Sequence, residues 1–294
     1  MIKTISKHIT FKQEEILNKI IKLLEVNDLR WLKEWEGGLA KNYITKKEYR
    51  GINAFVCNID KIEHKYKSNF YLTFLQVQKL KGHLKAGSIG VPIFYWDIRE
   101  KEITNDAGET EKRKMFFLRN YVVFNIEQTD IKVKEEENKV ILTPLESCEN
   151  VVASYKDKPV IEFISQSKAY YSPLDDRIVL PLKEQFKNIF AFYSTQFHEL
   201  SHSTGHEKRL KRDGIMKTDF FGGDIYGEEE IIAELSTIFL CASAGIEHET
   251  LNNNTAYIKG WLDNIRKDKT FLFKVISKGQ KSADYIVKNK MEMN

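Results

Sequence analysis

Cysteine is scarce in this chain: its 294 residues include only Cys57, Cys148 and Cys241, and no two of them form a CxxC pair. A disulfide framework or a zinc–thiolate site needs paired, closely spaced cysteines. We therefore predict three reduced side chains that act as small apolar residues. Proline (5) and glycine (15) are also few, with 42% hydrophobic and 30% charged residues, which excludes a collagen-like, low-complexity or mainly disordered chain.

Long apolar segments are absent as well. The mean hydropathy is −0.43, and no run approaches the roughly 18–20 residues that span a bilayer. The first residues, MIKTISKHITFKQEE, contain no apolar stretch of the kind found in signal peptides. We expect a cytoplasmic protein with no membrane partner.

The chain also lacks a large net charge of either sign, since its formal net charge is only +4. The charge is unevenly distributed: residues 1–130 carry an excess of Lys and Arg, whereas residues 131–294 are close to balance. This asymmetry favours two halves with different partners, although chance fluctuation explains it equally well on charge alone.

A charged segment, KVKEEENK beginning at Lys132, offers almost nothing apolar to bury. The length of the chain is typical of one or two domains. We therefore predict a first domain over residues 1–131, a linker over 132–146 and a second domain over 147–294.

Helix and strand signals alternate in the first half. Thr10 and Gln13 can form a capping box before apolar residues at helical spacing, which predicts a helix near the N-terminus. Further on, apolar runs rich in β-branched and aromatic residues indicate strands. The predicted elements are strands at Ile52–Cys57, Val91–Trp96 and Phe116–Ile126, a helix over Thr73–Leu84, and a charged hairpin or exposed loop at Arg99–Lys114.

The second half is predicted to be mainly helical. One long helix presents apolar residues from Phe186 to Leu200, and another presents them from Ile231 to Ala242. A helix from about Ala256 and a short C-terminal helix are expected to follow. The fold class is therefore α+β, with a mixed α/β domain followed by a mainly helical domain.

The strongest motif, HELSH beginning at His198, is an HExxH sequence inside a predicted helix. Residues at i and i+4 share a helix face, so His198 and His202 can ligate one metal ion. Glu199 then lies beside the metal, where it can accept a proton from water. Without a metal, the same residues would form a polar surface face, but the apolar Phe197 and Leu200 indicate a packed helix.

A third ligand is expected from the EEEIIAE segment that begins at Glu228. Glu230 and Glu234 are also i and i+4; we predict Glu230 as the ligand and Glu234 as the carboxylate that orients a metal-bound histidine. Glu229 is expected to face another way. Simple charge preference at a helix N-terminus accounts for Glu228 and Glu229, but poorly for Glu234, which lies in an apolar stretch.

This ligand set indicates a glutamate-type zincin. The pattern HExxHxxGxxH fails because Lys208 occupies its last position, and His206 is expected to be peripheral because Gly205 ends the helix. We expect one divalent ion, Zn²⁺ or alternatively Mn²⁺, and hydrolysis of a peptide in an unknown protein substrate. An oxyanion donor could come from Tyr226 or Tyr170, both of which could equally be core residues.

Several segments between about residues 30 and 250 form a series of motifs. They are YRGIN at Tyr49–Asn53, Leu72–Gly82, Leu118–Gln128, YYSPLDDRIVLP at Tyr170–Pro181, HELSHSTGHEKRLKRD at His198–Asp213 and YGEEEIIAELSTIFLCASAGI at Tyr226–Ile246. In order and spacing, these motifs resemble those of the ArdC-type antirestriction family.

The resemblance implies an N-terminal single-stranded-DNA-binding domain joined to a zincin-like metallopeptidase domain. It also implies carriage on conjugative elements and protection of incoming DNA from restriction. One departure concerns DNA: the family often has a basic KKGEKG turn, whereas Lys85–Gly90 reads KAGSIG.

Single-strand binding needs cations for phosphates and flat rings for bases. In the first half, basic residues alternate with aromatic ones, although each ring is more often a core residue. Trp31 and Trp96 are further candidates. The predicted DNA-binding residues are Lys46, Lys47, Tyr49, Arg50, Lys85 and Arg119.

Three hypotheses follow from these motifs. The first is a DNA-binding metallopeptidase that acts during conjugative entry, and intact Glu199 favours it because a structural metal site needs no general base. The second is a single-stranded-DNA-binding protein whose metal site is structural or inactive. The third, a conjugative primase accessory, ranks last because the sequence has no polymerase-type acidic cluster.

Overall fold

The computed structural model describes residues 10–104, 110–133, 142–216, 224–248 and 255–287, with side chains undescribed at 96–118, 224–226 and 255–258. Its contacts divide the chain into two compact units. One unit consists of residues 40–134. The other combines the residues before 40 with those from 135 onward.

This division differs from the sequence expectation for the N-terminal helix. Helix α1 (Phe11–Glu25) forms as predicted, with a capping box between Thr10 and Gln13. It packs against helix α9 (Thr255–Lys267) of the C-terminal half, and an ion pair joins Glu25 to Arg266. An apolar stripe on a helix requires a partner surface but does not name it, so the pattern could not assign residues up to 39 to the later unit.

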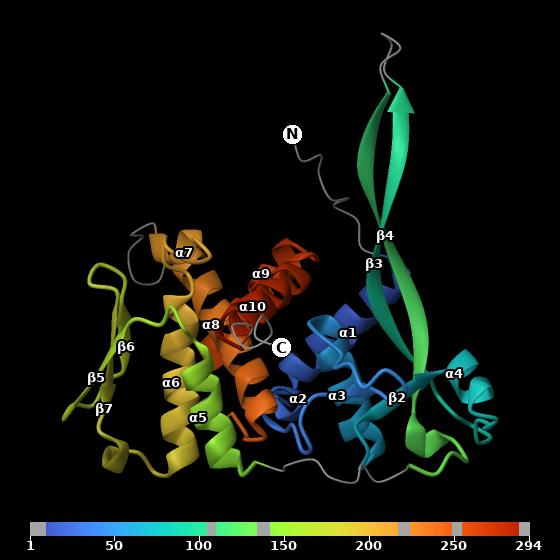
Figure 1. Cartoon of the computed structure of the whole chain (residues 1–294), viewed down its shortest axis with the longest axis horizontal. Coiled ribbons are helices and arrows are strands. Elements are labelled where there is room, and N and C mark those ends of the chain that lie inside the picture. Colours follow the sequence, from blue (N-terminus) through green and yellow to red (C-terminus); the bar gives the residue numbers. More distant parts are fainter. Residues whose placement is uncertain (1–9, 105–109, 134–141, 217–223, 249–254, 288–294) are drawn as a thin grey trace. The chain divides into compact units, whose positions relative to one another are not determined.

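The unit of residues 40–134 is built on a four-stranded sheet, in which β1 (Lys41–Asn42), β2 (Phe70–Thr73), β4 (Thr110–Asn125) and β3 (Val91–Thr104) lie in this order. Figure 1 shows the two long strands, β3 and β4, side by side. Strands β3 and β4 form a long antiparallel hairpin, with Val91 opposite Val123 and Thr104 opposite Thr110. This confirms the two later strands and the hairpin.

The strand predicted at Ile52–Cys57 is wrong, because these residues open helix α3 (Ile52–His64). Consecutive residues from Asn53 to Lys61 are buried on all sides of the helix. A short, continuous apolar run fits a buried strand and a buried helix equally well, so periodicity could not separate them. The side chain of Asn53 then fastens the helix to β3 by bonding both the N–H and the C=O of Phe94.

The helix predicted over Thr73–Leu84 is shorter in the structure. Helix α4 (Phe74–Lys79) begins after Thr73, whose side chain caps it, and ends at Leu80. A 3₁₀ turn, η1 (Ile126–Gln128), follows β4.

The other unit is mainly helical, with a small sheet in the order β5-β7-β6. The long helix expected from Phe186 begins at Ile189, because Asn188 caps it, and the C-terminal helix is long, not short. The further elements are α2 (Arg30–Lys33), α5 (Pro144–Ser154), β5 (Val160–Ile164), β6 (Tyr170–Ser172), β7 (Arg177–Pro181), η2 (Lys183–Gln185), α6 (Ile189–Ser203), α7 (Asp213–Met216), α8 (Asp224–Ala244), α9 (Thr255–Lys267) and α10 (Phe271–Val287).

Helices α6, α8 and α10 pack together and form the core of this unit, and β6 and β7 lie against α6. α8 and α10 approach closely at Gly279, where an added Cβ would lie 2.7 Å from the Cβ of Leu235. Among the described residues, no helix is both long and apolar enough to cross a membrane. The chain thus folds into one unit built on a mixed sheet and one mainly helical unit, which confirms the α+β fold class.

Candidate metal centre

The two histidines of the HExxH sequence lie one turn apart on α6. Asn188 fixes the start of this helix by accepting a hydrogen bond from the N–H of Ala191 at 2.8 Å. The Nε2 atoms of His198 and His202 are 3.0 Å apart. Both imidazoles therefore direct the same ring nitrogen toward one point.

Helix α8 brings a carboxylate to the same point. In Glu230, Oε2 lies 3.5 Å from Nε2 of His198, and Oε1 lies 3.4 Å from Nε2 of His202. One ligand atom from each of these three residues lies within 4.8 Å of the others, and no other such group of His, Cys, Asp and Glu occurs in the described part of the chain. The structure thus brings together the three side chains that the sequence indicates as ligands.

The donor set and its charge fit a divalent cation. Imidazole nitrogen and carboxylate oxygen are ordinary ligands of zinc. Arg212 compensates Glu229, whereas Glu199 and Glu230 place two further carboxylates beside the histidines. Negative charge in a partly buried site is costly unless a cation neutralises it, and a divalent ion would supply that compensation.

The ionisation of the site reflects these close pairs. Burial by itself would lower the pKa of His202, but Glu229 and Glu230 outweigh burial and raise that pKa to about 10. Burial would also lower the pKa of His198, but the carboxylates of Glu230 and Glu234 outweigh burial and raise it. Burial would raise the pKa of Glu230, but the two histidines lower it. In the metal-free site the carboxylate of Glu230 therefore stays ionised, and a bound metal ion would displace the protons from the two histidines.

Glu199 lies next to the two histidines without pairing with either. Its side chain is 7% exposed and forms no hydrogen bond or ion pair with the residues that the structure describes. Its charge nevertheless contributes to the raised pKa values of His198 and His202. A carboxylate in this position is available to accept a proton.

Glu234 is placed differently from the expected orienting role. Its Oε2 is 3.9 Å from Nδ1 of His198, beyond hydrogen-bond distance, and 2.7 Å from Nε2 of His248. His248 is 1% exposed, and its Nδ1 lies 3.2 Å from Oγ of Ser194. Glu234 therefore pairs mainly with a buried histidine that sequence reasoning missed, since His248 belongs to no motif and is 14 residues away.

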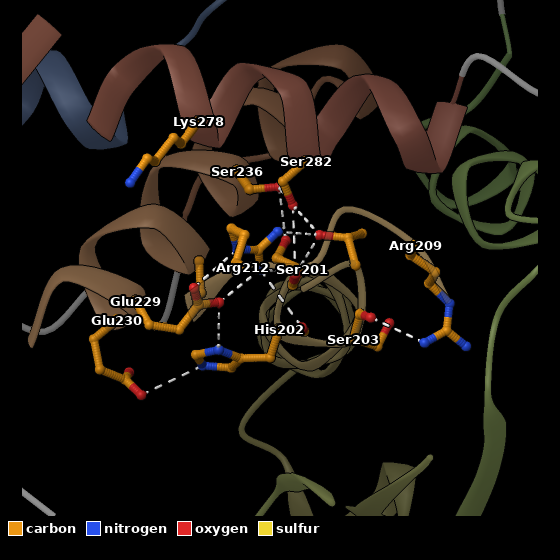
Figure 2. Close-up of polar contacts among 12 residues, drawn as sticks. Ser201, His202, Ser203, Arg209, Arg212, Glu229, Glu230, Ser236, Lys278 and Ser282 are labelled. Atoms are coloured by element: carbon orange, nitrogen blue, oxygen red, sulfur yellow. Dashed lines mark hydrogen bonds and ion pairs between the residues drawn. The ribbon is translucent and has the colours of Figure 1, made fainter. Parts of the chain in front are cut away.

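Glu229, which the sequence expectation sets aside, contacts a ligand histidine. Its Oε1 lies 3.4 Å from Nδ1 of His202, on the opposite side of the ring from Glu230 (Figure 2). Arg212 holds the same carboxylate through two hydrogen bonds. Burial would raise the pKa of Glu229, but Arg212 and His202 lower it. The helix-terminus argument failed because α8 begins at Asp224, which puts Glu229 beyond the first turn of the helix.

Other residues considered from the sequence lie outside this cluster. His206 is buried beyond the end of α6, where its Nδ1 accepts a hydrogen bond from the N–H of Lys208. Tyr170 is 41% exposed on β6. The side chain of Tyr226 lies outside the described residues, so the choice of an oxyanion donor stays open.

Tyr49 cannot serve as a base-stacking residue in this structure. It is 3% exposed and packs edge-on against Tyr71, with ring centroids 6.3 Å apart. Its position in the core corrects the DNA-binding prediction, because an aromatic ring beside basic residues is more often buried than displayed. Trp31 is also buried, at 2% exposure, and the side chain of Trp96 lies outside the described residues.

The five predicted basic residues are all exposed. The Nζ of Lys46 lies over the rings of Tyr43 and Phe70, at 4.4 and 4.5 Å. The Nζ of Lys85 donates to the backbone carbonyl of Glu127 at 2.8 Å. The others are Lys47, Arg50 and Arg119.

An exposed aromatic pair lies on the β3–β4 sheet beside one of these cations. Tyr95 and Tyr121 are 48% and 45% exposed, with ring centroids 5.9 Å apart. Arg119 lies directly opposite Tyr95 in the strand register and on the same face as Tyr121. Sequence reasoning named Arg119 but missed Tyr95, which alternation along a two-sided strand could have indicated.

Two family descriptions match consecutive parts of the chain. Residues 12–124 match the N-terminal domain of anti-restriction factor ArdC. Residues 148–278 match a zincin-like metallopeptidase, MPTase-PolyVal.

Curated relatives and solved structures agree with this pair of domains. The chain is 28% identical over 296 residues to a DNA primase TraC of Escherichia coli, but spans only 27% of its length, and it spans 20% of a second TraC. It is 26% identical over 282 residues, 90% of that protein, to the uncharacterized protein y4eC of Sinorhizobium fredii. Metal-free and Mn(II)-bound crystal structures of antirestriction protein ArdC from plasmid R388 are similar, with 28% and 27% identity, TM-scores of 0.78 and 0.76, and coverage of 97% of this chain and 100% of theirs.

Proposed function

Since the chain belongs to the ArdC-type family, joining an ArdC N-terminal domain to a zincin-like metallopeptidase domain, we propose that it is an antirestriction protein of a mobile element. It protects incoming DNA in conjugation by binding single-stranded DNA and by cleaving a protein substrate, in the cytoplasm of the recipient. The N-terminal domain, including residues 40–134, binds DNA, and the site between α6 and α8 hydrolyses peptide.

The observation that carries the peptidase part is the position of Glu199 beside three convergent ligands. His198, His202 and Glu230 would hold the ion. A divalent ion bound there would polarise a peptide carbonyl and lower the pKa of a water molecule. Glu199 would accept the proton of that water and return it to the leaving amine.

We assign Zn²⁺ as the metal, with Mn²⁺ as the alternative. Two imidazoles and one carboxylate are a common set of catalytic zinc ligands that leaves a coordination position open. The Mn(II)-bound structure of the R388 protein supports a divalent ion in the same fold.

Exposed aromatic rings and a neighbouring cation on the β3–β4 sheet support the DNA-binding part. Tyr95 and Tyr121 present exposed rings, and Arg119 adds a cation beside them. Single-strand binding combines these two contributions and depends little on sequence. The names of the TraC primases, which match this chain over part of their length, also support a DNA context.

Metal content is the first test of this proposal. Elemental analysis of the purified full chain is expected to find about one zinc or manganese ion per chain, lost in His202→Ala. His206→Ala is the matched control, because this histidine is also buried but lies outside the cluster. A metal-free wild type, even after metal is added back, would reject the metallopeptidase.

The Glu199→Gln variant then separates the two main hypotheses. We expect it to keep the metal and to bind DNA normally, but to lose peptide hydrolysis, because the amide cannot accept the proton. Restriction of DNA transferred by conjugation into a recipient carrying the variant measures the biological effect. If protection survives in Glu199→Gln, the protein acts by binding DNA and its metal site is structural or inactive.

A further inference from the structure

The imidazole of His202 is held from both sides by two consecutive residues of α8. Glu230 faces Nε2, and Glu229 faces Nδ1 at 3.4 Å (Figure 2). Glu229 is 2% exposed, so its contact with Nδ1 is shielded from bulk solvent. The ring orientation of one metal ligand therefore depends on where the Glu229 carboxylate is held.

Arg212 binds that carboxylate through a bidentate pair of hydrogen bonds. Its Nε donates to Oε2 of Glu229 at 2.8 Å, and its Nη2 donates to Oε1 at 2.6 Å. Paired hydrogen bonds of this kind restrict orientation as well as distance. The guanidinium compensates the buried charge of Glu229, so this carboxylate needs no second cation.

Arg212 is itself fixed to the helix that carries His202. Its Nη1 donates to Oγ1 of Thr204 at 2.6 Å, and its Nη2 also donates to the backbone carbonyl of Ser201 at 2.8 Å. A Cβ added at Gly205 would lie 3.0 Å from Nη2 of Arg212. The glycine leaves room for the guanidinium at the end of α6.

A cluster of buried hydroxyls continues the network behind the arginine. Ser201, Thr204, Ser236 and Ser282 are all 0% exposed and come from α6, its C-cap, α8 and α10. Ser236 bonds Ser201 at 2.8 Å and Ser282 at 2.9 Å, and Thr204 lies 2.8 Å from Ser282. Three helices thus meet at hydrogen-bonded groups directly behind Arg212.

We propose that Arg212 and Glu229 form a positioning pair that orients His202 and sets the affinity of the site for its metal. The proposal rests on the metal site of the proposed function. A carboxylate that accepts the second N–H of a ligating histidine fixes its tautomer and increases its basicity. Arg212 acts through Glu229, and neither residue is a ligand.

A second buried arginine offers a matched comparison. Arg209 pairs with Asp176 at 2.8 and 3.0 Å and donates to the carbonyl of Ser203, also at the end of α6. It therefore ties the β6–β7 turn to the same helix. Unlike Arg212, it touches no carboxylate that contacts His198 or His202.

The test compares Glu229→Gln and Arg212→Lys with Asp176→Asn and Arg209→Lys in the full-length protein. Calorimetric titration of metal-free protein with Mn²⁺ and with Zn²⁺ gives the dissociation constant, and thermal unfolding gives the stability of the metal-free form. We expect the first two variants to weaken metal binding roughly tenfold to a hundredfold. The second two are expected to lower thermal stability while the dissociation constant stays within about twofold of the wild type.

The pattern of outcomes decides between a positioning and a purely structural role. If Glu229→Gln and Arg212→Lys bind metal as tightly as the wild type while unfolding earlier, the pair is structural and the inference is overturned. If Glu229→Gln does not fold, the two Arg→Lys variants decide the question in the same way. A wild type that binds neither ion overturns the proposed function as well.

Discussion

At the residue scale, burial decides which members of a motif are available for chemistry. Tyr49 and Tyr121 both have an arginine within two residues in the sequence, yet Tyr49 is 3% exposed and Tyr121 is 45% exposed. Only an exposed ring can stack on a base. The DNA-binding surface is therefore expected on the face of the β3–β4 sheet that carries Tyr95, Arg119 and Tyr121.

Tyr121→Ala is predicted to weaken binding of single-stranded DNA by about 1–3 kcal/mol, the range for loss of one stacked base. Fluorescence anisotropy with a labelled oligonucleotide at fixed salt measures the change. Tyr170→Ala is the control, because this tyrosine is similarly exposed but lies on β6. Equal affinities of Tyr121→Ala and wild type would remove this sheet face from the DNA site.

Asp176 gives a prediction of pH dependence. Burial would raise its pKa, but hydrogen bonds from Arg209 and Tyr171 outweigh burial and lower it. Because the folded-state pKa lies below the unfolded one, the pair stabilises fully above the ordinary Asp range and is lost as pH falls through the lowered value.

Asp176→Asn is therefore expected to lower the free energy of unfolding by about 1–3 kcal/mol at pH 7. The difference from wild type should shrink below about pH 4. Asparagine tolerates the left-handed backbone of this position, where φ is 47°, so a strained turn does not confound the comparison. Chemical denaturation at several pH values measures it, and a difference independent of pH would contradict the assignment.

At the element scale, close helix packing places the charged groups of the metal site. Ser236 of α8 bonds both Ser201 of α6 and Ser282 of α10, on the side of α8 away from solvent. Gly279 permits this approach, because an added Cβ would also lie 3.2 Å from the backbone N of Ser236. Glycine is poor at the middle of a helix, so close packing accounts for its presence there.

Gly279→Ala is predicted to destabilise the protein by about 1–3 kcal/mol in spite of the better helix propensity of alanine. Gly260→Ala on α9 is the matched control, since no described atom outside the backbone of this helix lies within 4 Å of its added Cβ. That variant should gain about 0.5–1 kcal/mol. Thermal unfolding of the two variants would show opposite shifts, and a stabilised Gly279→Ala would disprove the close approach.

At the scale of the whole molecule, the first helix belongs to the unit that carries the metal site. Ile20 of α1 is 0% exposed, and Lys269 and Arg266 of the C-terminal half form ion pairs with Glu14 and Glu25 of α1. The family match over residues 12–124 begins in this helix. A domain boundary in sequence therefore does not coincide with the boundary between compact units.

Ile20→Ala is predicted to destabilise the metal-binding unit by about 2–5 kcal/mol, through the cavity that it leaves. Binding of Mn²⁺ should raise the temperature of the transition that the substitution lowers, because a ligand stabilises the unit that binds it. Val77→Ala, in the core of the other unit, is the control, and its effect should not respond to the metal. A metal-independent effect of Ile20→Ala would place α1 elsewhere.

Local pattern determined a large part of this protein. The capping box at Thr10, the alternation in β3 and β4, and the HExxH spacing on α6 each depend on residues a few positions apart. Periodicity and side-chain chemistry are sufficient for such features. The proposal of Glu230 as a ligand came from a pattern of the same local kind, and the structure brings Glu230 to the two histidines.

Only the tertiary structure decided the partners of residues far apart in sequence. In the folded chain, Ile52–Cys57 are helical and Tyr49 is buried. Glu234 pairs with His248, and Glu229, held by Arg212, contacts His202. These outcomes depend on which surfaces meet when α6, α7 and α8, or α3 and β3, pack together. Packing energy is a property of the assembled core and cannot be inferred from a few neighbouring residues. The sequence therefore indicated the candidate ligands, whereas the fold determined which side chains contact them.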